Sequence, residues 1–261
     1  MRLKEAAGWN QTREDWELLL RLAPEGCFGL ECDGTLAATT TAVCYGRELA
    51  WIGMVLTAPE FRGRGFARRL MEHAIEYLEG RGVAWIKLDA TGMGYPLYRR
   101  LGFEDECAVE RWRLSAEAPR PGGGGLGGGF TLADWLDLDR EAFGAGRGEL
   151  LSALAEHDAF AVPGGYAMGR PGSKAAFFGP CVAETPAAAR ALLTRFLARH
   201  AGQPVFWDLL PHNEAAVELA RESGFERARK LVRMARPGLA APPAFPHNDF
   251  HVFALAGFEY G

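Results

Sequence analysis

The sequence is poor in cysteine, and its cysteines form no recognisable pattern. There are five, an odd number, scattered along the chain without a Cys-x-x-Cys pair and without a Cys–His pair at metal-site spacing. A secreted domain held together by disulfides is therefore excluded. We expect reduced thiols, a cytoplasmic location and no metal site.

Long apolar runs and an excess of charge are missing as well. No run approaches the roughly 20 apolar residues of a membrane helix, and the N-terminal stretch MRLKEAAGWNQTREDWE is too polar for a secretory signal. The chain carries 29 Lys and Arg against 33 Asp and Glu, a net charge of −4, so it lacks the basic field of nucleic-acid-binding proteins. We expect neither a membrane nor a nucleic acid as partner.

Glycine, in contrast, is abundant. It makes up 33 of the 261 residues, or about 13% of the chain, against a usual share of roughly 7%. The densest run covers residues 118–129 (APRPGGGGLGGG), which offer almost no side chain to bury and predict a flexible linker. This linker divides the chain into residues 1–117 and residues 130–261, each long enough for one domain.

A second, sparser glycine pair has a different setting. Gly63 and Gly65 follow a predicted buried strand over residues 49–56 and a turn at Pro59, and they precede a predicted helix. No G-x-x-x-x-G-K-[ST] loop is present, and no G-x-G-x-x-G opens a strand–helix–strand unit. Glycines let backbone N–H groups approach a ligand, and a helix N-terminus attracts anions, so residues 62–67 predict a pyrophosphate site.

The two sides of the linker share one spacing pattern. The matching intervals are Leu70–Trp85 and Leu192–Trp207, both 15 residues, and Trp85–Phe103 and Trp207–Phe225, both 18 residues. The strand glycines Gly53 and Gly179 extend this pattern, except that the second half is four residues shorter where residues 62–67 lie in the first. The second half also has Ala220 at the place of Tyr98. We infer a repeated strand–helix–strand–helix unit, with one ligand-binding half and one degenerate half.

Two motifs of the first half resemble those of the GNAT acyltransferase superfamily. Residues 55–67 (VLTAPEFRGRGFA) are similar to its R/Q-x-x-G-x-G/A acyl-CoA loop, and residues 97–103 (LYRRLGF) to its L-Y-x-x-L-G-F ending. The second half, with Phe178-Gly179-Pro180 and Asn213-Glu214-Ala215-Ala216, resembles the C-terminal domain of tandem GNAT proteins of the YitH-like type.

The resemblance implies an α/β (α+β) fold class, with two tandem GNAT folds, each a mixed, mostly antiparallel sheet flanked by helices, the second degenerate. Residues 1–117 would form an N-terminal, acetyl-CoA-binding domain. Residues 130–261 would form a degenerate domain that shapes the acceptor site.

The resemblance also implies acetyl-CoA as co-substrate. Its pantetheine arm would bind where the fourth strand of the fold splays from the fifth, and its pyrophosphate in the glycine loop. The residues expected to bind it are Val55, Leu56 and Thr57 for the pantetheine arm, and Arg62, Gly63, Arg64, Gly65, Phe66 and Ala67 for the pyrophosphate. Thr91 stands where many members carry Asn, and we include it among the cofactor-binding candidates.

Acetyl transfer needs an acid for the departing thiolate and a base for the attacking amine. The resemblance gives Tyr98 the role of general acid. For the base the sequence offers Glu48, which precedes the predicted strand, and Asp89, near the end of the following one. His212 lies in the degenerate half at the matching strand end. The choice among these bases stays open.

The function predicted from these features is an acetyl-CoA-dependent N-acetyltransferase in which a small-molecule amine attacks the thioester directly. Two alternatives stay open. One is a non-catalytic acyl-CoA-binding sensor, and the other is a protein-lysine acetyltransferase, which needs an open groove for a peptide. The sequence does not name the acceptor amine, the acyl-chain length or the oligomeric state, for which a homodimer is one option.

Overall fold

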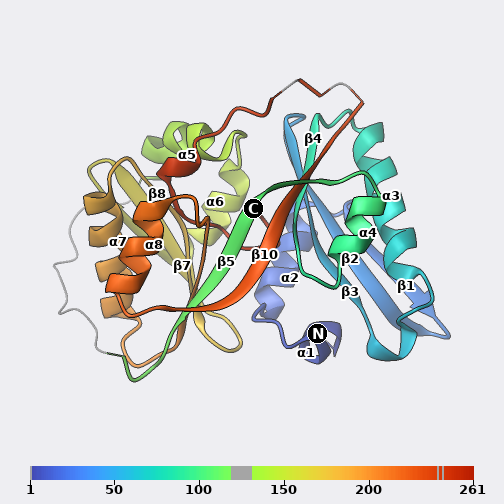
Figure 1. Ribbon diagram of the computed structural model, residues 1–261, viewed down its shortest axis with the longest axis horizontal. Helices are drawn as coiled ribbons and strands as arrows, with labels where there is room; N and C mark the ends of the chain where they lie inside the picture. The colour runs from blue at the N-terminus through green and yellow to red at the C-terminus, as the bar shows by residue number, and fades with distance from the viewer. Residues whose placement is uncertain (1, 119–130, 240, 243) are drawn as a thin grey trace. The chain divides into compact units, whose positions relative to one another are not determined.

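A computed structural model describes residues 2–118, 131–239, 241–242 and 244–261 (Figure 1). The predicted linker, residues 118–129, lies outside the described residues except for Ala118. The helices are α1 (Arg2–Ala7), α2 (Arg13–Leu22), η1 (Pro59–Phe61), α3 (Phe66–Gly80), α4 (Tyr95–Arg100), η2 (Leu132–Trp135), α5 (Leu136–Phe143), α6 (Gly148–Leu154), α7 (Pro186–Arg199), α8 (Glu214–Glu222) and η3 (Asp249–His251). The strands are β1 (Cys27–Cys32), β2 (Thr35–Tyr45), β3 (Leu49–Thr57), β4 (Trp85–Ala90), β5 (Glu104–Leu114), β6 (Asp158–Val162), β7 (Gly165–Arg170), β8 (Ala176–Ala183), β9 (Val205–Leu209), β10 (Glu226–Pro237) and β11 (Val252–Ala254).

None of the helices in the described part of the chain has the length and apolar content needed to span a bilayer.

The chain divides into two compact units that are not continuous in sequence. Unit 1 comprises residues 1–106, 232–245 and 258–261, and unit 2 comprises residues 107–231 and 246–257. The boundary cuts through β5 and β10, so each unit takes a strand segment from the other side of the predicted linker. The compact units therefore have other boundaries than the two halves of the sequence repeat. The division into domains of residues 1–117 and 130–261 stays a prediction.

Unit 1 is built on a mixed sheet with the order β1-β2-β3-β4-β10. All neighbouring strands are antiparallel except β3 and β4, which are parallel. The apolar face of α3, formed by Leu70, Met71, Ala74, Ile75 and Leu78, packs on this sheet in one core cluster with strand residues. Burial of this face explains why the 3.6-residue apolar period of the sequence forms a helix here.

The two central strands of unit 1 separate part-way along their length. Pairing between β3 and β4 is confined to Leu49–Trp51 with Trp85–Lys87. Beyond these residues β3 has a bulge, where Met54 adopts a φ of +51° and its carbonyl accepts a hydrogen bond from the Thr39 hydroxyl at 2.9 Å. A bulge bends a strand, so the last residues of β3 leave β4 and the splay implied by the resemblance is present.

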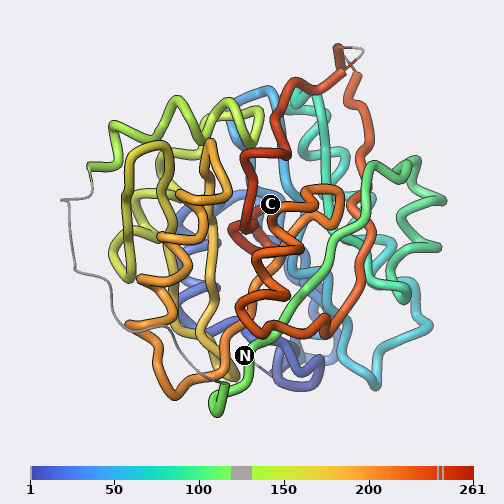
Figure 2. The backbone as a smooth tube through the Cα atoms, turned by 60° about the vertical axis from the view of Figure 1, so that its left-hand side comes forward, coloured from blue at the N-terminus to red at the C-terminus, as the bar shows by residue number. Residues whose placement is uncertain are grey.

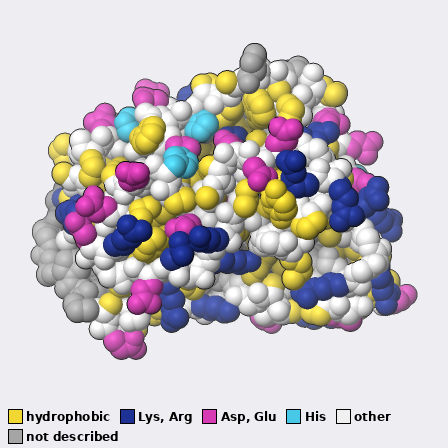
Figure 3. All heavy atoms as spheres, viewed as in Figure 1, with side chains coloured by type: hydrophobic (Ala, Val, Ile, Leu, Met, Phe, Trp, Pro, Cys, Tyr) yellow, Lys and Arg dark blue, Asp and Glu magenta, His cyan; other side chains and the backbone are white. Residues whose placement is uncertain are grey.

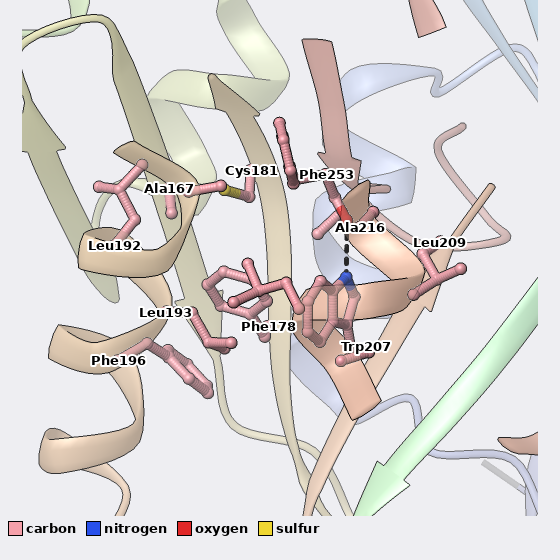
Figure 4. Close-up of a cluster of buried hydrophobic side chains, with 14 of the residues drawn as sticks. Ala167, Phe178, Cys181, Leu192, Leu193, Phe196, Trp207, Leu209, Ala216 and Phe253 are labelled. Atoms are coloured by element: carbon pink, nitrogen blue, oxygen red, sulfur yellow. Dashed lines mark hydrogen bonds between the residues drawn. The ribbon is translucent and has the colours of Figure 1, made fainter. Parts of the chain in front are cut away.

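Unit 2 repeats this arrangement with the strand order β5-β9-β8-β7-β6. Its parallel pair, β8 and β9, is joined at Ala176–Phe178 and Val205–Trp207 and then separates in the same way. The hydrophobic core of unit 2 contains Phe178, whose ring centre lies 5.3 Å from that of Trp207 (Figure 4). Helix α7 covers β6, β7 and β8, as α3 covers β1, β2 and β3 (Figures 1 and 2). The predicted repeat and the predicted fold class are both confirmed.

Candidate functional site

The predicted anion-binding loop joins the splayed end of β3 to the start of α3. Both of its glycines, Gly63 and Gly65, have a φ of +77°, in the left-handed region that side-chain-bearing residues rarely adopt. A Cβ at either position would meet no atom within 4 Å. Glycine is therefore required by the backbone conformation and not by a packed neighbour, and the loop surface is open.

Six consecutive backbone N–H groups of this loop, from Gly63 to Arg68, have no hydrogen-bond acceptor among the described residues. The first backbone bond of the helix runs from Arg69 N–H to the Gly65 carbonyl at 3.1 Å, and no side chain caps α3. Unit 2 differs at the corresponding helix, because the Thr185 hydroxyl accepts a hydrogen bond from the Ala188 amide at 3.2 Å. Of these two corresponding helix starts, as far as the structure describes them, the one in unit 1 presents the row of unpaired donors to an anion.

Positive side chains surround these donors. Arg62, Arg64, Arg68 and Arg69 are all exposed. The Arg64 guanidinium lies over the Phe61 ring at 5.2 Å, and the Arg62 guanidinium donates to the Thr57 carbonyl at 3.4 Å. The loop therefore combines fixed backbone dipoles with mobile charges of the same sign, as binding of a pyrophosphate requires.

The end of β3 contributes an unsatisfied polar atom next to the loop. The Thr57 hydroxyl is buried and has no hydrogen-bond partner among the described residues. A buried hydroxyl without a partner costs free energy, so this oxygen fits a site that a ligand completes.

Tyr98 lies on α4 with 8% of its surface exposed, in the same packed cluster as Val55 of β3. Its hydroxyl has no hydrogen-bond partner among the described residues, and burial raises the pKa of its phenol above the ordinary value. A Cβ on Gly94 would come within 2.9 Å of this hydroxyl, so glycine leaves the room that the tyrosine ring occupies. The protonated phenol is thus the form favoured by its surroundings.

Asp89 is the second-last residue of β4 and Thr91 directly follows the strand, and the two have different partners. The Asp89 carboxylate is fully buried and paired with the Arg233 guanidinium of β10, at 3.0 Å for Nε–Oδ1 and 3.2 Å for Nη2–Oδ2. The Thr91 hydroxyl accepts a hydrogen bond from the Gly94 amide at 3.4 Å. The Asp89 side chain therefore links β4 to β10, and that of Thr91 holds the β4–α4 connection.

Glu48 lies at the other end of β3 from the loop. Its carboxylate is exposed and accepts a hydrogen bond from the Arg47 amide at 2.9 Å. The nine residues of β3 separate it from residues 58–65 by about 25 Å or more, at about 3.3 Å per residue. The structure brings Tyr98 into one packed cluster with Val55 and the loop residue Arg62 into contact with Thr57, and it places Glu48 at the opposite end of β3.

Arg233 was missed by the sequence reasoning because it lies in the second half of the chain. It is 6% exposed, and its guanidinium also lies over the ring of Trp51 at 4.6 Å. A charged residue within the otherwise apolar stretch Leu231–Met234 is the one local indication that a buried partner exists.

In unit 2 the corresponding splay is filled by the chain itself. The repeat places Cys181 and Val182 at the positions of Val55 and Leu56. β11 pairs with β8 at these two residues, the Leu255 amide donates to the Asp208 carbonyl of β9 at 2.9 Å, and the Trp207 indole donates to the Phe253 carbonyl at 2.7 Å (Figure 4). A peptide segment therefore lies between the splayed strands of unit 2, whereas in unit 1 the C-terminal residues contact β3 nearer its start, where the Trp51 indole donates to the Phe258 carbonyl at 3.0 Å.

Two family models match the chain, one in each half. Residues 3–103 match the model described as "Acetyltransferase (GNAT) family", and residues 135–247 match the model described as "Acetyltransferase (GNAT) domain".

Two curated relatives have related names. "Uncharacterized N-acetyltransferase YitH" of Bacillus subtilis (strain 168) is 27% identical over 283 residues, which cover 100% of this chain and 94% of that protein. "Uncharacterized N-acetyltransferase MJ1207" of Methanocaldococcus jannaschii is 39% identical over 70 residues, and the match spans only 30% of its length and 25% of this chain.

Solved structures show the same fold. The protein described as "A Putative Acetyltransferase" from Pyrococcus horikoshii has a TM-score of 0.83 at 22% identity, covering 99% of this chain and 90% of that one. A tandem GNAT protein from the clavulanic acid biosynthesis pathway has a TM-score of 0.62 at 15% identity, covering 92% of this chain and 94% of that one.

Proposed function

Because this chain belongs to the GNAT acetyltransferase family in both of its halves, we propose that it is an N-acetyltransferase that uses acetyl-CoA bound to unit 1 and acts on a small-molecule amine. The observation that carries this proposal is the row of unpaired backbone N–H groups from Gly63 to Arg68. Acetyl-CoA carries an activated thioester, and its negatively charged pyrophosphate can accept hydrogen bonds from these backbone N–H groups.

The residues at the loop fit this co-substrate. The amides and the surrounding arginines, Arg62 and Arg64 among them, would hold the pyrophosphate. The splayed edge of β3, with Val55, Leu56 and the orphan hydroxyl of Thr57, would accept the pantetheine arm through backbone and side-chain hydrogen bonds. Phe66 and Ala67 begin α3 and set the direction of its first amides.

Unit 2 does not have room for a second acetyl-CoA in the equivalent position. β11 occupies its splay, Thr185 caps its helix, and Glu184 replaces the glycine loop with a negative charge. We therefore expect one acetyl-CoA per chain, bound by unit 1.

Tyr98 would supply the proton that the departing thiolate needs. Its pKa is raised by burial, so the phenol keeps its proton at neutral pH, and its hydroxyl has no competing protein acceptor among the described residues. This arrangement supports the role of general acid proposed for it.

Removal of a proton from the amine is the step with the least support from the geometry. Both oxygens of Asp89 are engaged by Arg233, and Glu48 lies at the far end of β3. A base role for either carboxylate stays a prediction, and proton loss to solvent is the route that competes with it.

The proposal is tested by titrating acetyl-CoA into the protein in a calorimeter and then screening amines with detection of the free thiol. We expect one binding event per chain and thiol release with at least one small amine. Absence of binding contradicts the proposal. Binding without thiol release for any amine favours the acyl-CoA sensor, and release only with lysine peptides favours the protein-lysine acetyltransferase.

A further inference from the structure

Three side chains that can bind a metal lie together in unit 2, and a fourth, His247, contacts one of them. The ligand atoms of Cys107, His212 and Asp249 all lie within 4.8 Å of one another. The Nε2 atom of His212 is 2.8 Å from the Asp249 Oδ2 atom, and the Nε2 atom of His247 is 3.4 Å from the same oxygen. Histidine side chains gather on the face that Figure 3 shows.

The sheet of unit 2 explains why Cys107 and His212 meet. β5 and β9 are antiparallel, with Glu110 opposite Leu209 and Arg111 opposite Asp208. Cys107 lies three residues before Glu110 on β5, and His212 lies in the turn three residues after Leu209. The pairing of β5 with β9 therefore brings the two residues to the same end of the sheet.

A buried asparagine fixes the other side of the cluster. Asn213, which is 2% exposed, donates through Nδ2 to the carbonyls of Asp249, Phe250 and Val252 at 3.2, 3.1 and 3.0 Å. Since Asn213 directly follows His212, these bonds hold the segment with Asp249 against the end of β9. The ligand groups are thus positioned by backbone contacts that do not depend on the ligands themselves.

We propose that Cys107, His212, His247 and Asp249 bind one Zn²⁺ ion. One thiolate, two imidazole nitrogens and one carboxylate oxygen form a four-ligand set of the kind that tetrahedral zinc takes in proteins. Zinc–ligand bonds of about 2.0–2.3 Å put the ligand atoms of a tetrahedron roughly 3.3–3.8 Å apart. The His212 and His247 Nε2 atoms lie 2.8 and 3.4 Å from the same Asp249 oxygen, so binding of one ion requires side-chain rotations that separate the first pair and bring His247 toward Cys107 and His212.

The site is structural in character, because all four positions come from the protein. Its four residues come from three parts of the chain, namely from β5, from the turn after β9, and from the segment of residues 246–257. That segment continues into β11, which fills the splay of β8 and β9. A zinc ion would therefore fasten this filling segment to the sheet, and binding would release the proton of the Cys107 thiol.

The competing explanation is that Asp249 simply accepts hydrogen bonds from the two imidazoles and that no ion binds. The two explanations differ in what they require of Cys107. A hydrogen-bonded carboxylate does not need the thiol, whereas the zinc site loses one of its four ligands without it.

The test uses the untagged full-length protein, first stripped with a chelator and then titrated with Zn²⁺ against a chromogenic chelator and, separately, with Co²⁺. We expect one ion per chain, a thiolate-to-cobalt charge-transfer band, and a rise in the melting temperature with Zn²⁺ that a chelator reverses. Cys107→Ser should abolish the band. Cys107→Ser and His212→Ala should each weaken Zn²⁺ binding by more than the roughly 10–100-fold that outer-shell changes cost.

His251→Ala is the matched control, because His251 lies on the same short helix as Asp249 and its ring contacts Asn248 and Glu141. It should bind Zn²⁺ as the unchanged protein does. Absence of stoichiometric binding, binding without the charge-transfer band, or an equal loss in His251→Ala would overturn the proposal. Circular dichroism of each variant without metal shows that a loss of binding is not a loss of fold.

Discussion

Arg233 lies directly opposite Asp89 across the antiparallel pair of β10 and β4, and the two side chains form a two-point ion pair although 144 residues separate them. Both are shielded from solvent, with side-chain exposures of 7% and 0%. A residue from the second half of the sequence thus neutralises a buried carboxylate of unit 1.

Arg233→Met should destabilise the protein by about 3–5 kcal/mol, because it leaves the Asp89 charge buried without its partner. The double variant Asp89→Asn, Arg233→Met should recover most of this loss, since no buried charge is then unpaired. Urea unfolding of the four proteins measures the coupling. Arg13→Met, which breaks an exposed pair with Glu17, should leave the transition in place. Equal losses in the single and double variants would contradict the assigned role.

Tyr98→Phe should lower kcat by about 10²–10⁴-fold while leaving the affinity for acetyl-CoA within a few fold, because it removes a proton donor and keeps the ring. Steady-state kinetics and calorimetry separate the two effects. The fold should be unaffected, since no described residue loses a hydrogen bond. If kcat stays unchanged, Tyr98 is not the acid, and the thiolate leaves unprotonated or takes its proton from water.

The raised pKa of Tyr98 also predicts a pH dependence of stability. The folded state holds this proton more tightly than the unfolded state, so the stabilisation is present below the ordinary tyrosine pKa of about 10 and is lost as pH rises above it. Compared with Tyr98→Phe, the unchanged protein should lose up to about 1.4 kcal/mol per pH unit above that value. Unfolding curves of both proteins between neutral pH and pH 11 test this. Parallel curves would show that the phenol titrates alike in both states.

Gly65→Ala should weaken acetyl-CoA binding by about 5- to 30-fold, because the left-handed backbone that aims the loop amides costs about 1–2 kcal/mol for a residue with a Cβ. Gly82→Ala is the matched control, since Gly82 has a φ of +71° and open space around it but lies after α3. It should lose similar stability and no affinity. Calorimetric titration of acetyl-CoA into both variants tests this prediction. An equal loss of affinity in Gly82→Ala would show that the weaker binding comes from lost stability and not from the loop.

Local features of the sequence predicted local features of the structure. The loop around Gly63 and Gly65 and the helix α3 follow from turn chemistry and apolar period within about 20 residues. Equal spacing predicted that the two halves share one folding pattern.

Long-range pairing could not be predicted in the same way. The contact of Asp89 with Arg233, and that of Cys107 with His212, depend on which strands become neighbours, and this is decided by the packing of whole sheets. The expectation of no metal site came from spacing along the chain, whereas His212 and Cys107 are 105 residues apart. Glu48 was considered as a base because it precedes a strand, and only the direction of β3 shows that it lies at the far end.

Because β5 passes into unit 2 and β10 into unit 1, the sequence repeat and the compact folding unit have different boundaries. A gene fragment that encodes one sequence repeat does not encode one folding unit, because each repeat gives a strand to the other unit and takes one in return. Recombination at the linker would therefore join halves whose strands have never been matched. A tandem protein newly joined at the linker must therefore pair β10 with β4 and β5 with β9 before either unit is complete.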